Sequence, residues 1–242
     1  MSGDPDLPLL EHLTALRRAL LRSLAAVALL LVPGYFAAPY AIRRLARWCV
    51  PQEAGPLHYF APMEAFKVQL EFGAFLAIAV SFPWCMFQIW SFVVPALKKS
   101  ERKFILRGTL LSSLLFLLGA TFCVILILPL LMKFSAGFSS NELMPVLGLE
   151  PFLSLAGGIT LAFGLMFQLP LLVLLAVRFG WLSAAAVSHA RPYVWTIILV
   201  LSALLTPPDI ASQLMLAVPT GLLFEGGLLL AGILEKNRED SP

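Results

Sequence analysis

The sequence has few charged residues for its length. Only 13% of its 242 residues are Asp, Glu, Lys or Arg, whereas a soluble domain carries about a quarter. Hydrophobic residues make up 60% of the chain. This balance excludes an ordinary water-soluble fold and indicates a protein whose surface lies mostly in lipid.

The residue patterns of most enzymes and metal proteins are also missing. The three cysteines and three histidines have neither the spacing of a metal site nor that of a disulfide framework. There is no zinc-hydrolase His-Glu pair, no Gly-x-Ser-x-Gly turn and no glycine-rich phosphate loop. We therefore expect no catalytic residue, no metal and no cofactor, and nothing indicates a nucleic-acid surface.

What the sequence does contain is a series of long apolar runs. Four carry no charge and are long enough to cross a bilayer core of about 30 Å, and two more lie near the C-terminus. The predicted spans are residues 23–41, 72–96, 108–132, 151–177, 192–206 and 213–231. The fold prediction is an all-α, polytopic membrane protein with six transmembrane helices in a single membrane domain, residues 1–242.

The basic residues predict the orientation. Twelve of the 17 Lys and Arg residues lie in the N-terminal segment, the second and fourth connections and the tail, and five in the first and third connections. The positive-inside rule then places both termini in the cytoplasm. Three of those five are Arg43, Arg44 and Arg47, in a segment whose apolar residues indicate an amphipathic interfacial helix.

The last two spans are predicted to form a short hairpin. The fifth has about 15 residues, or about 22 Å of helix, which is less than the bilayer core. Pro207 and Pro208 cannot continue a helix, so the turn that ends at Asp209 must reach the external interface. We expect the bilayer to thin at this hairpin, or the hairpin to sit high.

Polar residues inside the spans need a partner or a role, because an ionised side chain there costs about 3 kcal/mol or more. Gln168 is expected near the midplane of the fourth span, which Pro170 is expected to kink. Gln168 either bonds to a neighbouring span or is a polar dock for a partner's helix. Arg191 and Glu225 lie 18 and 16 residues from Asp209 along the two arms of the hairpin, which predicts a structural ion pair.

The predicted cytoplasmic side carries an apolar helical face and two carboxylates. Leucines at helical spacing line the segment before the first span: Leu9, Leu13, Leu16 and Leu20. Glu101 stands amid five basic residues, and Glu11 lies on the same side of the membrane. Glu101 either balances its neighbours or, with Glu11, receives the guanidinium groups of an arginine-bearing peptide through bidentate hydrogen bonds.

Six motifs are spread along nearly the whole chain. They are His12-Leu13-x-x-Leu16-Arg17, Pro62-x-Glu64-Ala65-Phe66, Phe92-x-x-Pro95-Ala96-Leu97, Phe163-Gly164-x-x-Phe167-Gln168-x-Pro170, Arg191-Pro192-Tyr193 and Leu205-Thr206-Pro207-Pro208-Asp209-x-x-Ser212-Gln213. Each alone is weak evidence. Together they resemble the TatC family, the multispanning signal-peptide-receptor subunit of the twin-arginine protein translocase.

The resemblance implies a concave receptor and not an enzyme. Such a protein binds twin-arginine signal peptides at its cytoplasmic face. With TatA-like and TatB-like single-span partners, and as a homo-oligomer, it supports proton-motive-force-driven transport of folded proteins across the cell inner membrane. The implied sites are Glu101, Phe92, Glu11, His12, Leu16 and Arg17 for the signal peptide, Gln168 and Pro170 for partner helices, and Glu64, Asp209 and Gln213 in external loops.

One position departs from the family pattern His-Leu-x-Glu-Leu-Arg. This sequence has Ala15 in place of the Glu, and Glu11, one helical turn earlier, is the candidate replacement. The alternative function is a secondary transporter or proton-coupled channel, motivated by Glu71, Gln168 and Glu225 in or near the hydrocarbon. An intramembrane enzyme is a third reading, but no nucleophile and base stand at a useful spacing.

Overall fold

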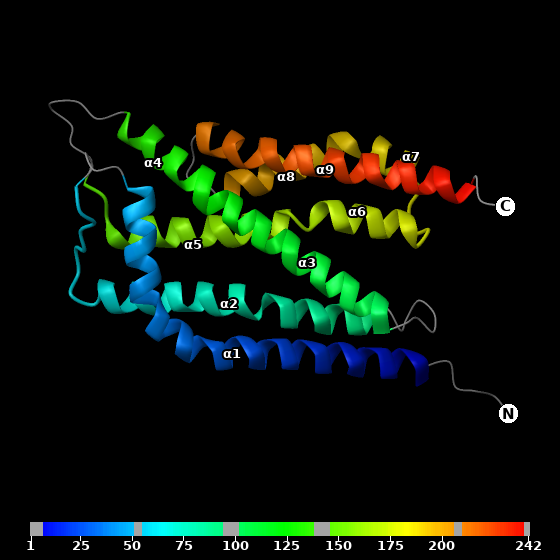
Figure 1. Ribbon diagram of the computed structural model, residues 1–242, viewed down its shortest axis with the longest axis horizontal. Coiled ribbons are helices and arrows are strands. Elements are labelled where there is room, and N and C mark those ends of the chain that lie inside the picture. Colours follow the sequence, from blue (N-terminus) through cyan, green and yellow to red (C-terminus); the bar gives the residue numbers. More distant parts are fainter. Residues whose placement is uncertain (1–6, 51–54, 94–101, 138–145, 206–209, 240–242) are drawn as a thin grey trace. The chain divides into compact units, whose positions relative to one another are not determined.

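A computed structural model of the chain describes residues 7–50, 55–93, 102–137, 146–205 and 210–239, which are almost entirely helical (Figure 1). The elements in chain order are α1 (Leu7–Cys49), α2 (Glu64–Val93), α3 (Arg102–Phe122), the π-helical turn η2 (Cys123–Ile127), α4 (Leu128–Ala136), α5 (Leu149–Met166), α6 (Leu169–Arg178), α7 (Ala184–His189), α8 (Arg191–Leu205) and α9 (Ile210–Glu239).

Five helical segments of the described chain are long and apolar enough to cross a membrane, and α8 is a shorter apolar helix. The all-helical, multispanning prediction is therefore confirmed, with α8 as the short fifth span of 15 residues. Several helices outrun the predicted spans, because helical hydrogen bonding continues past the apolar run. The 43 residues of α1 extend about 65 Å at 1.5 Å per residue.

Two further differences concern the fourth and sixth spans. The predicted kink at Pro170 is a short break of two residues, since α5 ends at Met166 and α6 begins at Leu169, while Phe167 and Gln168 keep right-handed helical backbone angles. The predicted short hairpin applies to α8 alone, because α9 has 30 residues. The last turns of α9 stay helical beyond the membrane span, and there the Glu235 carboxylate accepts a hydrogen bond from the backbone N–H of Ala184, at the start of α7 (2.8 Å).

The chain groups into two compact units, one of residues up to 42 with 66–114, the other of residues 43–65 with 115 onward. In the first unit α1 and α2 pack backbone to backbone. A Cβ added to Gly34 of α1 would lie 2.5 Å from the carbonyl oxygen of Gly73 in α2. Small residues of this kind allow close packing between membrane helices, where lipid provides no hydrophobic drive.

α1 bends in its second half, as Figure 1 shows, and contains Pro33 and Pro39. Pro39 has no N–H, so the carbonyl of Tyr35 lacks its usual donor four residues later. The side-chain amide of Gln69 in α2 donates to that oxygen instead, at 3.1 Å. Because lipid offers no hydrogen bonds, this bond stabilises the bend.

In the second unit, η2 and α4 show the same feature: a proline leaves a carbonyl without a main-chain donor, and a side chain from another helix donates to it. In η2 the N–H of Leu128 donates to Cys123, one residue further back than in an α-helix. The next donor in this pattern would be residue 129, which is a proline. The carbonyl of Val124 therefore has no main-chain donor, and the indole N–H of Trp48 supplies one at 3.1 Å.

Candidate functional sites

Two residues of the predicted peptide site meet in the first unit. The His12 ring on α1 stacks on Phe92 in the last turn of α2, with centroids 4.3 Å apart and planes at 24°. His12 is exposed, and so are Leu16 and Arg17 one turn further along α1. The end of this unit therefore carries an accessible surface with aromatic, apolar and cationic side chains.

The acidic members of the predicted peptide site lie beyond what the structure describes. Glu101 is outside the described residues, as is Asp209 of the external turn, and for Glu11 only the backbone is described. α1 is helical through both Glu11 and Ala15. The two positions therefore share one face of the helix, which is the geometry that a replacement of the family Glu requires.

Gln168 lies at the break in the fourth span. Its backbone N–H bonds to Leu165, three residues back, at 2.9 Å, so the carbonyl of Gly164 loses its usual donor. The side-chain Nε2 of Gln168 donates to that carbonyl at 3.4 Å. Gln168 is buried, with 8% of its surface exposed. The side chain thus stabilises the broken turn of its own helix.

The helices around this break pack closely. A Cβ at Gly164 would lie 2.5 Å from the Phe116 ring of α3, and one at Gly119 of α3 would lie 2.6 Å from the carbonyl oxygen of Phe163 in α5. On α6, Pro170 lies against α9, where a Cβ at Gly227 would be 2.5 Å from the Pro170 Cα. Gln168 and Pro170 are therefore held by helices on both sides of the break.

α6 to α9 share a core of their own, which holds the short α8 in place. Its buried residues are Val177, Val187, Ile198, Ala217, Phe224, Leu228 and Ala231. Gln213 adds a polar link, since its Nε2 donates to the carbonyl of Leu199 in α8 at 3.1 Å.

Glu64 organises the predicted external loops. Its side chain is buried, and its carboxylate accepts hydrogen bonds from the backbone N–H groups of Phe60 (2.6 Å), Ala61 (3.1 Å) and Glu150 (3.1 Å). A backbone bridge reinforces this contact: His58 donates to Leu147 at 2.9 Å and accepts from residue 149 at 2.7 Å. The carboxylate thus joins the start of α2 to the first turn of α5, where helix dipoles favour a negative charge.

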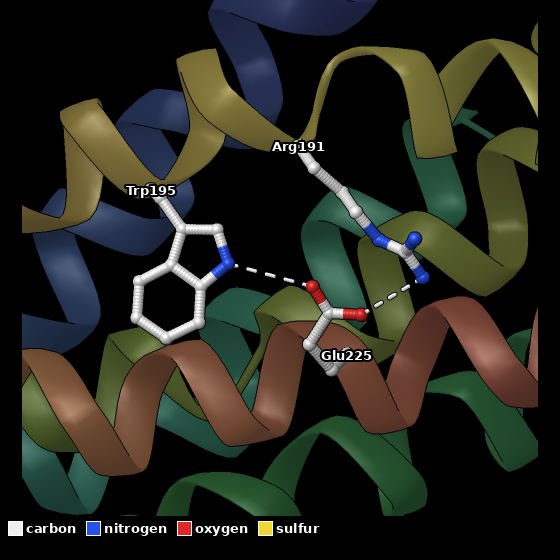
Figure 2. Close-up of polar contacts among 3 residues, drawn as sticks. All are labelled: Arg191, Trp195 and Glu225. Atoms are coloured by element: carbon white, nitrogen blue, oxygen red, sulfur yellow. Dashed lines mark hydrogen bonds and ion pairs between the residues drawn. The ribbon is translucent and has the colours of Figure 1, made fainter.

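The ion pair predicted in the final hairpin is present. Arg191 Nη2 of α8 lies 3.1 Å from Glu225 Oε2 of α9, and Trp195 Nε1 donates to the other carboxylate oxygen at 3.4 Å (Figure 2). The side chains of Arg191 and Glu225 are 44% and 30% exposed. The Trp195 ring also covers Gly221, where a Cβ would overlap it. Both oxygens of the membrane carboxylate are therefore engaged.

Sequence reasoning did not identify the roles of Trp195, Trp48, Gln69 and Glu235. The role of Trp195 could have been predicted from its spacing, because it lies one helical turn after Arg191 and so shares its face. For Trp48 and Gln69, the prolines mark the carbonyls that need a donor, but the residue that donates comes from another helix. Glu235 had no signal, since its partner is a backbone N–H 51 positions away.

These features define a multi-pass membrane protein with an exposed surface of aromatic, apolar and cationic side chains where α1 begins and α2 ends. The model of the family described as Sec-independent protein translocase protein (TatC) matches residues 11–219. Two similar proteins carry that name: one from Listeria innocua is 30% identical over 95% of this chain and 93% of its own length, and one from Haemophilus influenzae is 32% identical over 98% and 94%.

A crystal structure of a twin arginine translocase receptor, TatC, is also similar, with a TM-score of 0.84 and 27% identity over 92% of this chain and 98% of that one. The chain belongs to the TatC family. Members of this family are components of a protein translocase and not enzymes, which also decides against a solute transporter.

Proposed function

We propose that this chain is the subunit that receives twin-arginine signal peptides, and that the peptide binds beside the His12–Phe92 stack. That stack is the observation that carries the proposal, because it brings two separate motifs of the predicted site together at one surface. The similarity to a solved translocase receptor supports it. The site comprises His12, Leu16, Arg17 and Phe92, with Glu11 and Glu101 as the acidic members.

The chemistry of the site suits a peptide with paired arginines. Two guanidinium groups require carboxylates for bidentate hydrogen bonds, which Glu101 and Glu11 would provide. An aromatic face such as that of Phe92 attracts a guanidinium group in addition. Leu13 and Leu16 are 59% and 37% exposed and would receive the apolar part of the peptide.

The receptor would work with small partner subunits. TatA-like and TatB-like single-span helices would dock on the exposed side of the fourth span beside the break at Gln168 and Pro170, where Leu165 and Leu172 are 57% and 58% exposed. Glu64, Gln213 and Asp209 would shape the opposite, external end. The complex would sit in the cell inner membrane, contain more than one copy of this chain, and use the proton-motive force to move folded proteins.

Photocrosslinking in membranes tests the proposal. A photoreactive aromatic residue at position 92, with Glu101 intact, should label a twin-arginine precursor, and the same precursor with two lysines in place of the arginines is the matched control. Glu101→Ala, probed from position 92, should abolish labelling, and Glu11→Ala should weaken it. Undiminished labelling of Glu101→Ala would show that the peptide is recognised elsewhere.

A further inference from the structure

Three arginines lie on the side of the membrane where basic residues are disfavoured. Arg43, Arg44 and Arg47 belong to the last two turns of α1, in the connection between the first and second spans. That connection is on the opposite side from the N-terminus, because one span separates them. Under the positive-inside rule such a cluster is unusual on this side of the membrane.

The structure directs this cluster outward. Arg43, Arg44 and Arg47 are all exposed, and they recur at spacings that share one helix face. The opposite face is turned inward: Leu45 and Ala46 are half-buried, and Cys49 is 3% exposed. The last turns of α1 are therefore amphipathic, with all three guanidinium groups on the accessible side.

The helix that carries the arginines is held in place. The indole of Trp48 donates to Val124 at 3.1 Å, and the thiol of Cys49 lies 4.0 Å from the same oxygen. Trp48 is nevertheless 59% exposed, so its ring lies beside the arginines on the accessible face. Tryptophan at this position is typical of a helix in the membrane interface.

The cluster has no protein counter-charge among the described residues. No carboxylate there forms an ion pair with any of the three arginines. The nearest acid in the sequence, Glu53, lies outside the described part and is one carboxylate against three guanidinium groups. An exposed cluster of three positive charges beside a membrane attracts anionic lipid headgroups, by about 1 kcal/mol for each basic residue.

We propose that Arg43, Arg44 and Arg47 form a binding site for the phosphate headgroups of anionic phospholipids in the leaflet opposite the termini. Guanidinium groups bind phosphate oxygens in bidentate geometry, and the amphipathic helix places them at headgroup depth. The site shares no residue with the proposed peptide-binding surface, and it does not depend on the receptor function proposed above.

The test is lipid photolabelling of the full chain in vesicles. Vesicles contain either phosphatidylglycerol or phosphatidylcholine with the same photoreactive group near the headgroup, and labelled segments are located by mass spectrometry. We expect the segment 43–50 to be labelled at least threefold more from phosphatidylglycerol. The threefold preference should shrink at high salt, because screening weakens exposed charge interactions.

Variants of the arginine cluster and one matched control define the result. The combined change Arg43→Gln, Arg44→Gln and Arg47→Gln should reduce labelling by phosphatidylglycerol to the phosphatidylcholine level, while the corresponding lysine variant should keep most of the preference. The matched control Lys103→Gln with Arg107→Gln should leave labelling of segment 43–50 unchanged. If the triple glutamine variant does not fold, Arg44→Gln alone should give a partial loss.

Equal labelling by the two lipids, or an unchanged preference in the glutamine variants, would overturn the proposal. So would crosslinks from a photoreactive residue at position 44 to an acidic protein segment in place of lipid.

Discussion

The clearest energetic consequence of the structure concerns Trp48. Trp48→Phe removes the N–H that donates to Val124 at 3.1 Å and leaves a carbonyl without a donor where η2 and Pro129 have withdrawn both main-chain donors. An acceptor left without its hydrogen bond costs about 1–3 kcal/mol. Because Trp48 is 59% exposed, we expect a loss in the lower half of that range, about 1–2 kcal/mol.

The assay is equilibrium unfolding in detergent micelles. Trp48→Phe and Pro129→Ala are measured singly and together, as a double-mutant cycle. Alanine at 129 restores an N–H that reaches Val124, so Trp48→Phe in that background should cost less than about 0.5 kcal/mol. Trp84→Phe, at another exposed tryptophan, is the control and should behave alike in both backgrounds. Additive effects of Trp48→Phe and Pro129→Ala, within about 0.5 kcal/mol, would refute the reasoning.

Three further predictions use the same unfolding assay. Arg191→Gln and Glu225→Gln should couple by about 1 kcal/mol, the value for a half-exposed pair, and strictly additive effects would show that the 3.1 Å contact carries no energy. Glu64→Gln should destabilise by about 2 kcal/mol, since an amide presents one acceptor where a carboxylate accepts three N–H groups; an unchanged unfolding midpoint would contradict this. Gly164→Ala should destabilise the protein by about 1–3 kcal/mol, because the new Cβ overpacks against the Phe116 ring. The control Gly158→Ala, with nothing within 4 Å of its Cβ, should be neutral or stabilising. Equal effects of the two changes would argue against close packing at Gly164.

The sequence predicts the membrane architecture well, because lipid restricts what a span can be. The length of the apolar runs and their lack of charge predict the spans. Counting residues outward from the turn at Asp209 predicts that Arg191 meets Glu225. Both inferences need only helical geometry and chain order. The short α8 follows from the same reasoning, since neither Pro207 nor Pro208 can continue a helix.

The contacts between distant segments could not be predicted in this way. Once the helix is known, the local sequence shows that Pro129 leaves Val124 without a donor, but that Trp48 provides one depends on the packing of the last turns of α1 against η2. The buried position of Glu64 depends likewise on the meeting of the first connection with α5. The break at Gln168 was expected only as a kink, because its extent depends on the packing of Pro170 against Gly227.

The peptide site combines residues from motifs that lie far apart in the sequence. His12 and Phe92 come from motifs 80 positions apart, and their stacking supports the resemblance that suggested both. The role of Glu101 rests on the sequence pattern and on chemistry. Its contribution is therefore the quantity that most needs to be measured.

The most direct measurement is the affinity of the purified chain for a twin-arginine signal peptide, compared with the same peptide carrying two lysines. We predict that wild type prefers the arginine peptide at least tenfold, which is about 1.4 kcal/mol, and that Glu101→Gln removes most of this preference. Equal affinity for the two peptides, or an undiminished preference in Glu101→Gln, would contradict the assignment of this surface as a twin-arginine receptor.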